Sequence, residues 1–211
     1  GDSTVGANII ADKGIDIGGD LTLKGDADEE IAFTTDGAVD SDIKLGGSVD
    51  NTAGESLKLD SGSDGDIAVT GDVTLTGGDL TVTEARDVTF GGDVTADDIT
   101  VTDANDVDFD KTVTADNFKQ DNGTGTTTFT GAIDLAQDFD FKGDKLTING
   151  KDNTIDGNLV ATVGTLLTTG NAANLDIGGS LTQDGAGDST VGANIIADKG
   201  IDIGGDLTLK G

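Results

Sequence analysis

Two stretches of this chain, DVTFGGDVTADDI (Asp87–Ile99) and DVDFDKTVTADNF (Asp106–Phe118), align at an offset of 19. The alignment places Phe90 on Phe109, and one step further, at an offset of 20, Phe109 falls on Phe129. Each such period contains three short apolar–polar–apolar segments. Three strands in about 19–20 residues are the signature of a parallel β-helix, a solenoid whose coils hydrogen-bond to the coils on either side.

Stacked coils place equivalent residues in columns along the solenoid axis. We expect the three phenylalanines to form an internal aromatic column, and Val94, Val113 and Ile133 to form an aliphatic one. A single coil cannot bury its apolar faces, so the stability has to come from stacking. The chain has no proline, which fits a fold in which nearly every strand is central and needs its backbone N–H groups.

The same alternation runs along the whole chain and predicts an all-β protein. Apolar residues recur at every second position, with Gly and Asp between the segments, and no stretch shows helical spacing. We therefore expect residues 1–211 to form a single continuous β-solenoid. Representative triplets are Ile15-Asp16-Ile17, Leu21-Thr22-Leu23, Ile43-Lys44-Leu45, Leu57-Lys58-Leu59, Ile67-Ala68-Val69, Leu80-Thr81-Val82, Phe139-Asp140-Phe141 and Leu146-Thr147-Ile148.

A second and longer repeat is superimposed on the coil period. The segment GDSTVGANIIADKGIDIGGDLTLKG (Gly1–Gly25) recurs without change as Gly187–Gly211. Residues 1–186 then form one full period, and residues 187–211 begin the next. A period of this length predicts nine or ten coils and ~45 Å of axial length. Identical copies indicate recent tandem duplication or a repeat kept uniform because its copies must match, and we expect this chain to be a window of a longer protein.

Composition excludes several classes of function. The net charge is −29, and His, Cys, Met, Trp and Tyr are absent. Without Cys or His the chain has no disulfides, no thiolate or imidazole metal site and no His-dependent triad. Its acidity argues against nucleic acid or an anionic membrane as a direct partner, because both favour Lys and Arg clusters. No apolar run is long enough to span a membrane, so membrane insertion is not expected.

Parallel β-helices also serve as polysaccharide-degrading enzymes, but we expect no catalytic activity here. Glycoside hydrolysis needs two carboxyl groups ~5–10 Å apart, one of them with a pKa raised by burial. The paired Asp residues alternate with apolar ones, so they should point outward and be solvated. Arg86 is the only arginine, and the chain has no Tyr or Trp to stack on a sugar ring. The pairs are Asp97-Asp98, Asp106/Asp108/Asp110 and Asp138/Asp140.

No cofactor is expected, and calcium is the one ion that the sequence raises as an alternative. Outward carboxylates should stack one coil apart, and a hard cation would relieve their repulsion. These carboxylates are Asp87 with Asp106, Asp97 with Asp116, and their neighbours Asp108 and Asp110. The GGD segments Gly18–Asp20, Gly77–Asp79 and Gly91–Asp93 lack the second half of the calcium β-roll motif. We favour turn chemistry for them, with Gly at positive φ and an Asp side chain bonded to the backbone.

Two surface features could carry binding. Between Ile31 and Val69 the triplets lie further apart, and we expect 36–42, 46–55 and 60–66 to be loops that bulge from one side. Residues 154–174 are also less regular. Threonines Thr81/Thr83 and Thr100/Thr102 lie one coil apart, as in ice-binding solenoids, but Lys119 and Asp121 end that row after two rungs.

Two stretches of the chain resemble a known type of repeat. IAFTTDGAVDSDIKLGG…ESLKLDSGSDGDIAVTGDV (Ile31–Val73) and DLTVTEARDVTFGGDVTADDITVTDANDVDF (Asp79–Phe109) resemble the repeat regions of large bacterial secreted proteins. These are the filamentous-haemagglutinin-like and autotransporter-like β-strand-repeat adhesins. The resemblance implies a right-handed parallel β-helix, secretion to the cell surface, and a role as a stalk, fibre or adhesin.

The sequence thus predicts a structural repeat unit of an extracellular fibre, stalk or sheath. Its main partner would be itself, either as identical repeats in one long chain or as subunits stacked end to end. The alternative is a binding module that recognises a surface glycan or protein through residues 36–66.

Overall fold

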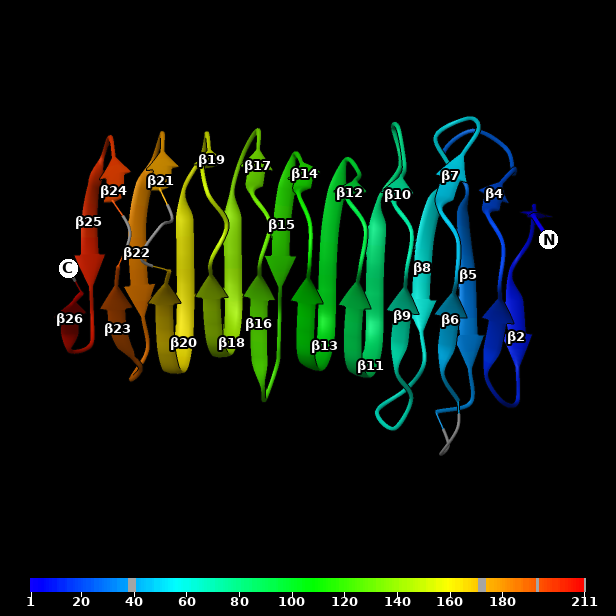
Figure 1. The fold of residues 1–211 in the computed structure, drawn as a ribbon, viewed down its shortest axis with the longest axis horizontal. Helices are drawn as coiled ribbons and strands as arrows, with labels where there is room; N and C mark the ends of the chain where they lie inside the picture. The colour runs from blue at the N-terminus through cyan, green and yellow to red at the C-terminus, as the bar shows by residue number, and fades with distance from the viewer. Residues whose placement is uncertain (38–40, 171–173, 193, 211) are drawn as a thin grey trace.

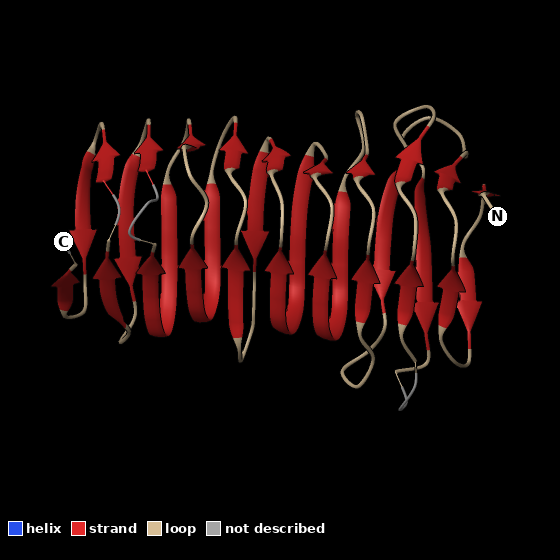
Figure 2. Cartoon of the chain, in the orientation of Figure 1, coloured by secondary structure: helices blue, strands red, loops and turns tan. Residues whose placement is uncertain are grey.

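The structure is a computed structural model that describes residues 1–37, 41–170, 174–192 and 194–210, and the side chains of these residues except for 165–169. Strands and turns alone make up these ranges (Figure 2). All the strand pairs are parallel, and the chain winds into a β-solenoid of about ten turns that lie side by side along one axis (Figure 1). The predicted fold class is confirmed, while its handedness stays an expectation from the resemblance.

Each coil of the solenoid crosses three faces in the same order, and we call them faces one, two and three. Face one is a separate sheet of ten strands: β1 (Ser3–Val5), β4 (Leu21–Leu23), β7 (Val49–Asn51), β10 (Val73–Thr74), β12 (Val94–Thr95), β14 (Val113–Ala115), β17 (Ile133–Leu135), β19 (Asn153–Ile155), β21 (Asn174–Ile177) and β24 (Asn194–Ala197).

Faces two and three belong to one 16-stranded sheet. Face two holds β2 (Ile9–Ala11), β5 (Glu30–Thr35), β8 (Ser56–Asp60), β15 (Asn117–Gln120), β22 (Ser180–Asp184) and β25 (Gly200–Ile203). Face three holds β3 (Ile15–Ile17), β6 (Ile43–Leu45), β9 (Ile67–Val69), β16 (Thr126–Phe129), β23 (Asp188–Val191) and β26 (Leu207–Leu209). Four long strands cross both faces: β11 (Leu80–Phe90), β13 (Asp98–Phe109), β18 (Phe139–Ile148) and β20 (Leu159–Thr169).

The long strands modify the expected pattern of three short strands per coil. In four coils the second and third segments join, and the chain bends without leaving the sheet. At the bend Ala85 pairs with Ala104, and both are buried, with exposures of 4% and 1%. A methyl side chain occupies little space inside the corner, so the strand can turn there and keep its hydrogen bonds to the next coil.

The predicted columns are confirmed. Phe90 pairs with Phe109 and Phe109 with Phe129, and their ring centroids are 5.1 and 4.9 Å apart in stacked geometry. On face one Val94 pairs with Val113, which pairs with Ile133. All six side chains are at most 1% exposed. The core is therefore one continuous apolar column inside the solenoid.

The coil length is less uniform than predicted. The expected spacing holds for the central coils, in which Val94 pairs with Val113. The first coil is slightly shorter, since Ser3 pairs with Leu21, and the next is much longer, since Leu21 pairs with Val49. Strand pairing fixes only the residues on the three faces. The turns absorb the difference, because a longer turn at a corner costs little closure entropy.

The expectation of three loops on one side is wrong. Range 46–55 contains β7, whose Val49 is fully buried on face one. The turn that remains, 52–55, joins face one to face two, whereas 36–42 and 60–66 join face two to face three. Figure 1 shows these turns at opposite edges, above β7 and below β6 and β9. Residues 38–40 lie outside the described ranges.

The predicted irregularity at 154–174 corresponds to an extra residue in β20. Gly143 of β18 pairs with Val163, but Lys145 pairs with Leu166, so the register shifts by one residue between these pairs. The shift explains why the adjacent pair Leu166-Leu167 interrupts the alternation of the sequence. Residues 171–173 lie outside the described ranges.

Candidate functional site

The corner between faces one and two carries a row of Asp and Asn side chains that link successive coils. Most of the side-chain oxygens accept the backbone N–H of the equivalent residue one coil further on, and that of Asp98 accepts the side-chain amide N–H of Asn117. The distances are 3.1 Å from Asp98 N to Asp79 Oδ1, 3.1 Å from Asp138 N to Asn117 Oδ1, and 2.7 Å from Asn158 N to Asp138 Oδ1. These residues therefore satisfy backbone donors at the corner, where the strand ladder is interrupted.

The GGD segments have the same role, which confirms the expected Asp-to-backbone bond. Asp20 Oδ1 accepts the N–H of Ser48 and Asp93 Oδ1 that of Thr112, both at 2.9 Å. The partner lies in the next coil, so the bond joins two coils instead of closing a local turn.

The predicted positive φ of the GGD glycines is wrong for all but Gly77, at +73°. The reason for glycine is close approach. A Cβ on Gly19 would lie 2.5 Å from the carbonyl oxygen of Gly1, and one on Gly47 would lie 2.5 Å from the carbonyl carbon of Gly19. Gly71 contacts Gly47 and Gly92 contacts Gly71 in the same way, so these glycines stack in a column from coil to coil. Side chains are excluded from this column because the backbones of successive coils meet there.

The carboxylates considered for calcium lie where the sequence placed them. Asp87 pairs with Asp106, and the N–H of Asp116 donates to the carbonyl of Asp97 over 2.6 Å. Partial burial raises the pKa of Asp108, and its neighbours Asp106 and Asp110 add to this rise. Within the described ranges no three carboxylates are grouped so that they could hold a metal ion.

Most of the carboxylates considered for catalysis are exposed as predicted, namely Asp97, Asp98, Asp110, Asp138 and Asp140, whereas Asp106 and Asp108 are half-buried. A hollow in the surface is lined by Asp98, Asn117, Lys119, Asp138 and Asp140. Two of its acidic groups, Asp98 and Asp138, belong to the row of Asp and Asn side chains at the corner. The threonine row also follows the prediction, since Thr81 pairs with Thr100 and Thr100 with Lys119.

Glu55, in the turn at 52–55, is a buried residue that sequence reasoning missed. Its side chain is fully buried and accepts the N–H groups of Gly25, Thr52 and Ala53 at 2.8, 2.9 and 2.7 Å. Burial alone would raise the pKa of Glu55, but these backbone donors outweigh it and lower the pKa to about 2. The available signal was its residue type, since the chain has 37 Asp and only four Glu.

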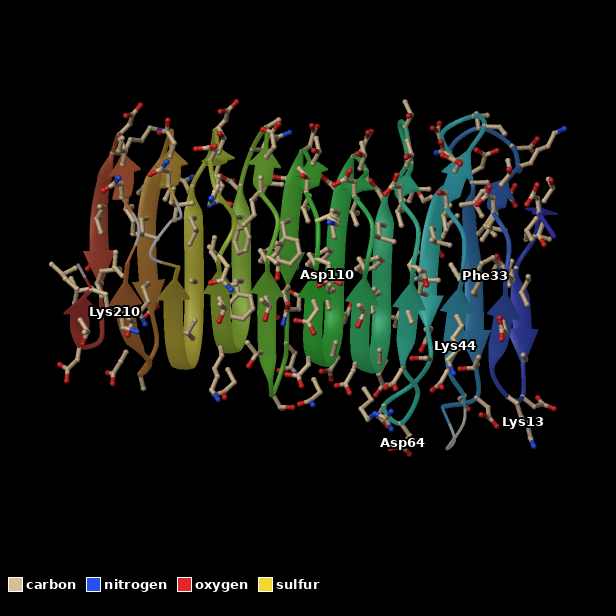
Figure 3. The ribbon with its side chains drawn as sticks, viewed as in Figure 1. Lys13, Phe33, Lys44, Asp64, Asp110 and Lys210 are labelled. Atoms are coloured by element: carbon tan, nitrogen blue, oxygen red, sulfur yellow. The ribbon has the colours of Figure 1, made fainter. Side chains whose placement is uncertain are left out.

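Arg86 braces the turn at 60–66, from which Asp64 projects (Figure 3). Its backbone N–H donates to the carbonyl of Gly65 over 2.7 Å, and its guanidinium pairs with Asp66 and donates to the carbonyl of Asp64 over 3.3 Å. The guanidinium also lies 3.6 Å from Asp87. The turns at 52–55 and 60–66 are thus tied to neighbouring coils.

The last coil of the solenoid exposes residues whose equivalents in the first copy are buried. Ile15 and Leu21, in the first copy, are 7% and 1% exposed beneath β6 and β7. The same residues in the second copy, Ile201 and Leu207, are 53% and 49% exposed, and Leu209 is 73% exposed. The last described coil therefore presents apolar side chains at positions that the first copy covers with a further coil.

Together these features define a β-solenoid repeat protein whose candidate site is its own coil-stacking surface. Comparisons with protein-family models, curated proteins and solved structures give no match for this chain. In the described part of the chain, no helix has the length and apolarity needed to cross a membrane.

Proposed function

We propose that this chain is a structural repeat unit of an extracellular fibre, stalk or sheath, as in adhesin-like surface filaments, built by end-to-end continuation of its coils. One observation carries the proposal: both copies of the Gly1–Gly25 segment are coils of the same solenoid, with the same internal register. Ser3 pairs with Leu21 in the first copy, and Ser189 with Leu207 in the second. A segment that forms the same coil in both copies can pair with a coil that precedes it and with a coil that follows it, and so can continue the rod.

The mechanism is mechanical. Each internal coil is hydrogen-bonded to two neighbours through three faces, so bending or extending the rod has to break many bonds together. Outward Asp side chains give the net charge of −29 that keeps rods hydrated and apart. Continuation into a further copy would cover the open edges that an isolated solenoid exposes. The partner is then the chain itself, and the location outside the cell follows from the resemblance.

Lengthening the chain tests this proposal. A chain in which residues 26–211 follow Gly211 should form one rod that is longer by ~42 Å, with an unchanged cross-section in small-angle X-ray scattering. Two compact bodies joined by a flexible link would contradict it. Native material should also contain fibres with this axial repeat in electron micrographs.

The alternative, a binding module that uses residues 36–66, makes a different prediction. Replacement of Ser63 and Asp64 by glycine alters the exposed tip of one turn and leaves the bracing contact of Asp66 in place. Soluble monomers that bind a surface glycan or protein, and lose this binding in the variant, would overturn the structural role.

A further inference from the structure

The two identical segments lie on different faces of the solenoid. In the first copy β1 lies on face one, β2 on face two and β3 on face three. In the second copy the equivalent strands β23, β24 and β25 lie on faces three, one and two. The second copy is therefore out of phase with the first by one face.

The change of face leaves the local structure of the segment intact. In the first copy, the N–H of Ser3 donates to the carbonyl of Asp20 over 2.8 Å. In the second copy, the N–H of Ser189 donates to the carbonyl of Asp206 over 2.7 Å. The segment thus has no preferred face, and the number of strands that precede it decides where it lies.

The length of the period explains the phase. Counted from β1, β21 is the eighth return of the chain to face one, and β23 lies two faces beyond that strand. One period, residues 1–186, therefore contains eight and two-thirds coils, fewer than the nine or ten expected from the sequence. The longer coils at 21–73 account for the difference.

We infer that successive copies of this period in a fibre are rotated by one third of a turn about the axis, so that only every third copy repeats the same orientation. This inference rests on the proposed continuation of the rod. Each copy would advance ~42 Å, and three copies, which make a whole number of coils, would advance ~125 Å. The turns at 52–55 and 60–66 then project in three directions in succession.

The structure contains the contacts that such a junction needs. Upstream of the second copy, β20, β21 and β22 pair with β23, β24 and β25. Downstream of the first copy, β5, β6 and β7 pair with β2, β3 and β4. The second copy therefore shows how the segment pairs with the coil that precedes it, and the first copy shows how it pairs with the coil that follows it. A junction between two periods needs both sets of pairs.

The rotation has a consequence for lateral contacts. Ile10 is 79% exposed on face two, and its equivalent Ile196 is 59% exposed on face one. Aligned copies would place all of these exposed isoleucines on one face of the rod. The rotation instead distributes them over three faces, separated by acidic surface.

A labelled array tests the rotation. The chain extended to three copies would carry a small folded domain inserted between Ser63 and Asp64 of each copy, both exposed at the tip of the turn. In electron micrographs averaged along the rod, successive domains should point one third of a turn apart. Domains aligned along one side, or alternating between two opposite sides, would overturn the inference.

A matched control removes one whole coil, residues 94–112, from every copy. Because Val94 pairs with Val113, the remaining ends meet in register. The axial step should shorten by ~4.8 Å and the rotation should not change. The array also separates the two proposals. Rotated domains on a rod support the rotation of successive copies even if native material shows no fibres. The absence of fibres would contradict only the proposed function.

Discussion

At the scale of single residues, the chain uses side chains to satisfy backbone groups that its strands leave open. Glu55 does this most completely, because one carboxylate receives three backbone N–H groups from two turns, 25–29 and 52–55. Its longer side chain reaches a position inside the corner that Asp would not reach. Period-two patterns show whether a side chain points into the core or outward, but they carry no information on contacts at the corners. The sequence therefore did not predict the contacts of Glu55.

Glu55→Gln should lower the free energy of unfolding by about 2 kcal/mol, because a neutral amide replaces a buried carboxylate that accepts several hydrogen bonds. The loss should depend on pH. The folded pKa of about 2 lies below the ordinary 4.5, so the native carboxylate stabilises the fold fully above pH 4.5 and loses this effect as the pH falls toward 2. Urea unfolding of both proteins at several pH values measures the difference.

The control is Glu30→Gln, which changes an exposed carboxylate paired with Lys58 at 3.8 Å. It should alter stability by less than ~0.5 kcal/mol. Equal losses for the two variants would show that the contacts of Glu55 do not matter to the fold.

At the scale of strands and coils, the sequence was a good guide to register. Equivalent apolar positions such as Phe90 and Phe109 pair as predicted, because a slip of one residue would turn every apolar side chain outward. The same rule gives no information about corners. The bend at Ala85, the strand β7 within an expected loop, and the number of coils per period all depend on turn lengths, which the alternation does not specify.

The row of Asp and Asn side chains between faces one and two permits a prediction at this scale. Burial raises the pKa of Asp79, and the neighbouring charges of Asp98 and Asp97 add to the rise. Asp98→Asn removes a like charge and keeps the side-chain oxygen, so it should raise the free energy of unfolding by about 0.3–0.5 kcal/mol near pH 7. Chemical denaturation at low salt measures this gain.

Asp98→Ala is the matched comparison. It removes the same charge, but it also removes the acceptor that Asn117 Nδ2 contacts at 2.8 Å. This variant should be less stable than Asp98→Asn by about 1 kcal/mol. If the alanine variant is as stable as the asparagine variant, the row does not contribute hydrogen bonds that matter.

At the scale of the whole molecule, the balance between charge repulsion and coil stacking sets the response to solution conditions. A net charge of −29 destabilises any compact state, and added salt screens this repulsion. Most of the Asp side chains lie outside the solenoid, so the repulsion acts along its full length, while the stacked core opposes it.

The pH dependence of stability should therefore pass through a maximum in mild acid. Asp79 and Asp108 have folded pKa values above the ordinary 3.8, so they oppose folding at neutral pH, and their unfavourable effect fades as they bind protons in the folded state. Asp42, whose pKa is lowered by its hydrogen bonds to Lys44 and to the N–H of Asp66, and Glu55 act in the opposite sense at lower pH. Thermal unfolding at low salt should give a Tm that rises as the pH falls from 7 into mild acid and that falls below about pH 4.

Added salt separates the two sides of this maximum. In 0.5 M NaCl (~4 Å screening length) the rise in mild acid should shrink by the part that comes from repulsion between neighbouring charges, while the part that comes from burial of Asp79 and Asp108 remains. The fall below pH 4 should persist, because the contacts of Glu55 are buried and are screened much less. A Tm that declines steadily from pH 7 downward at low salt would contradict this account, since it would mean that the paired carboxylates outweigh the repulsion along the rod at every pH.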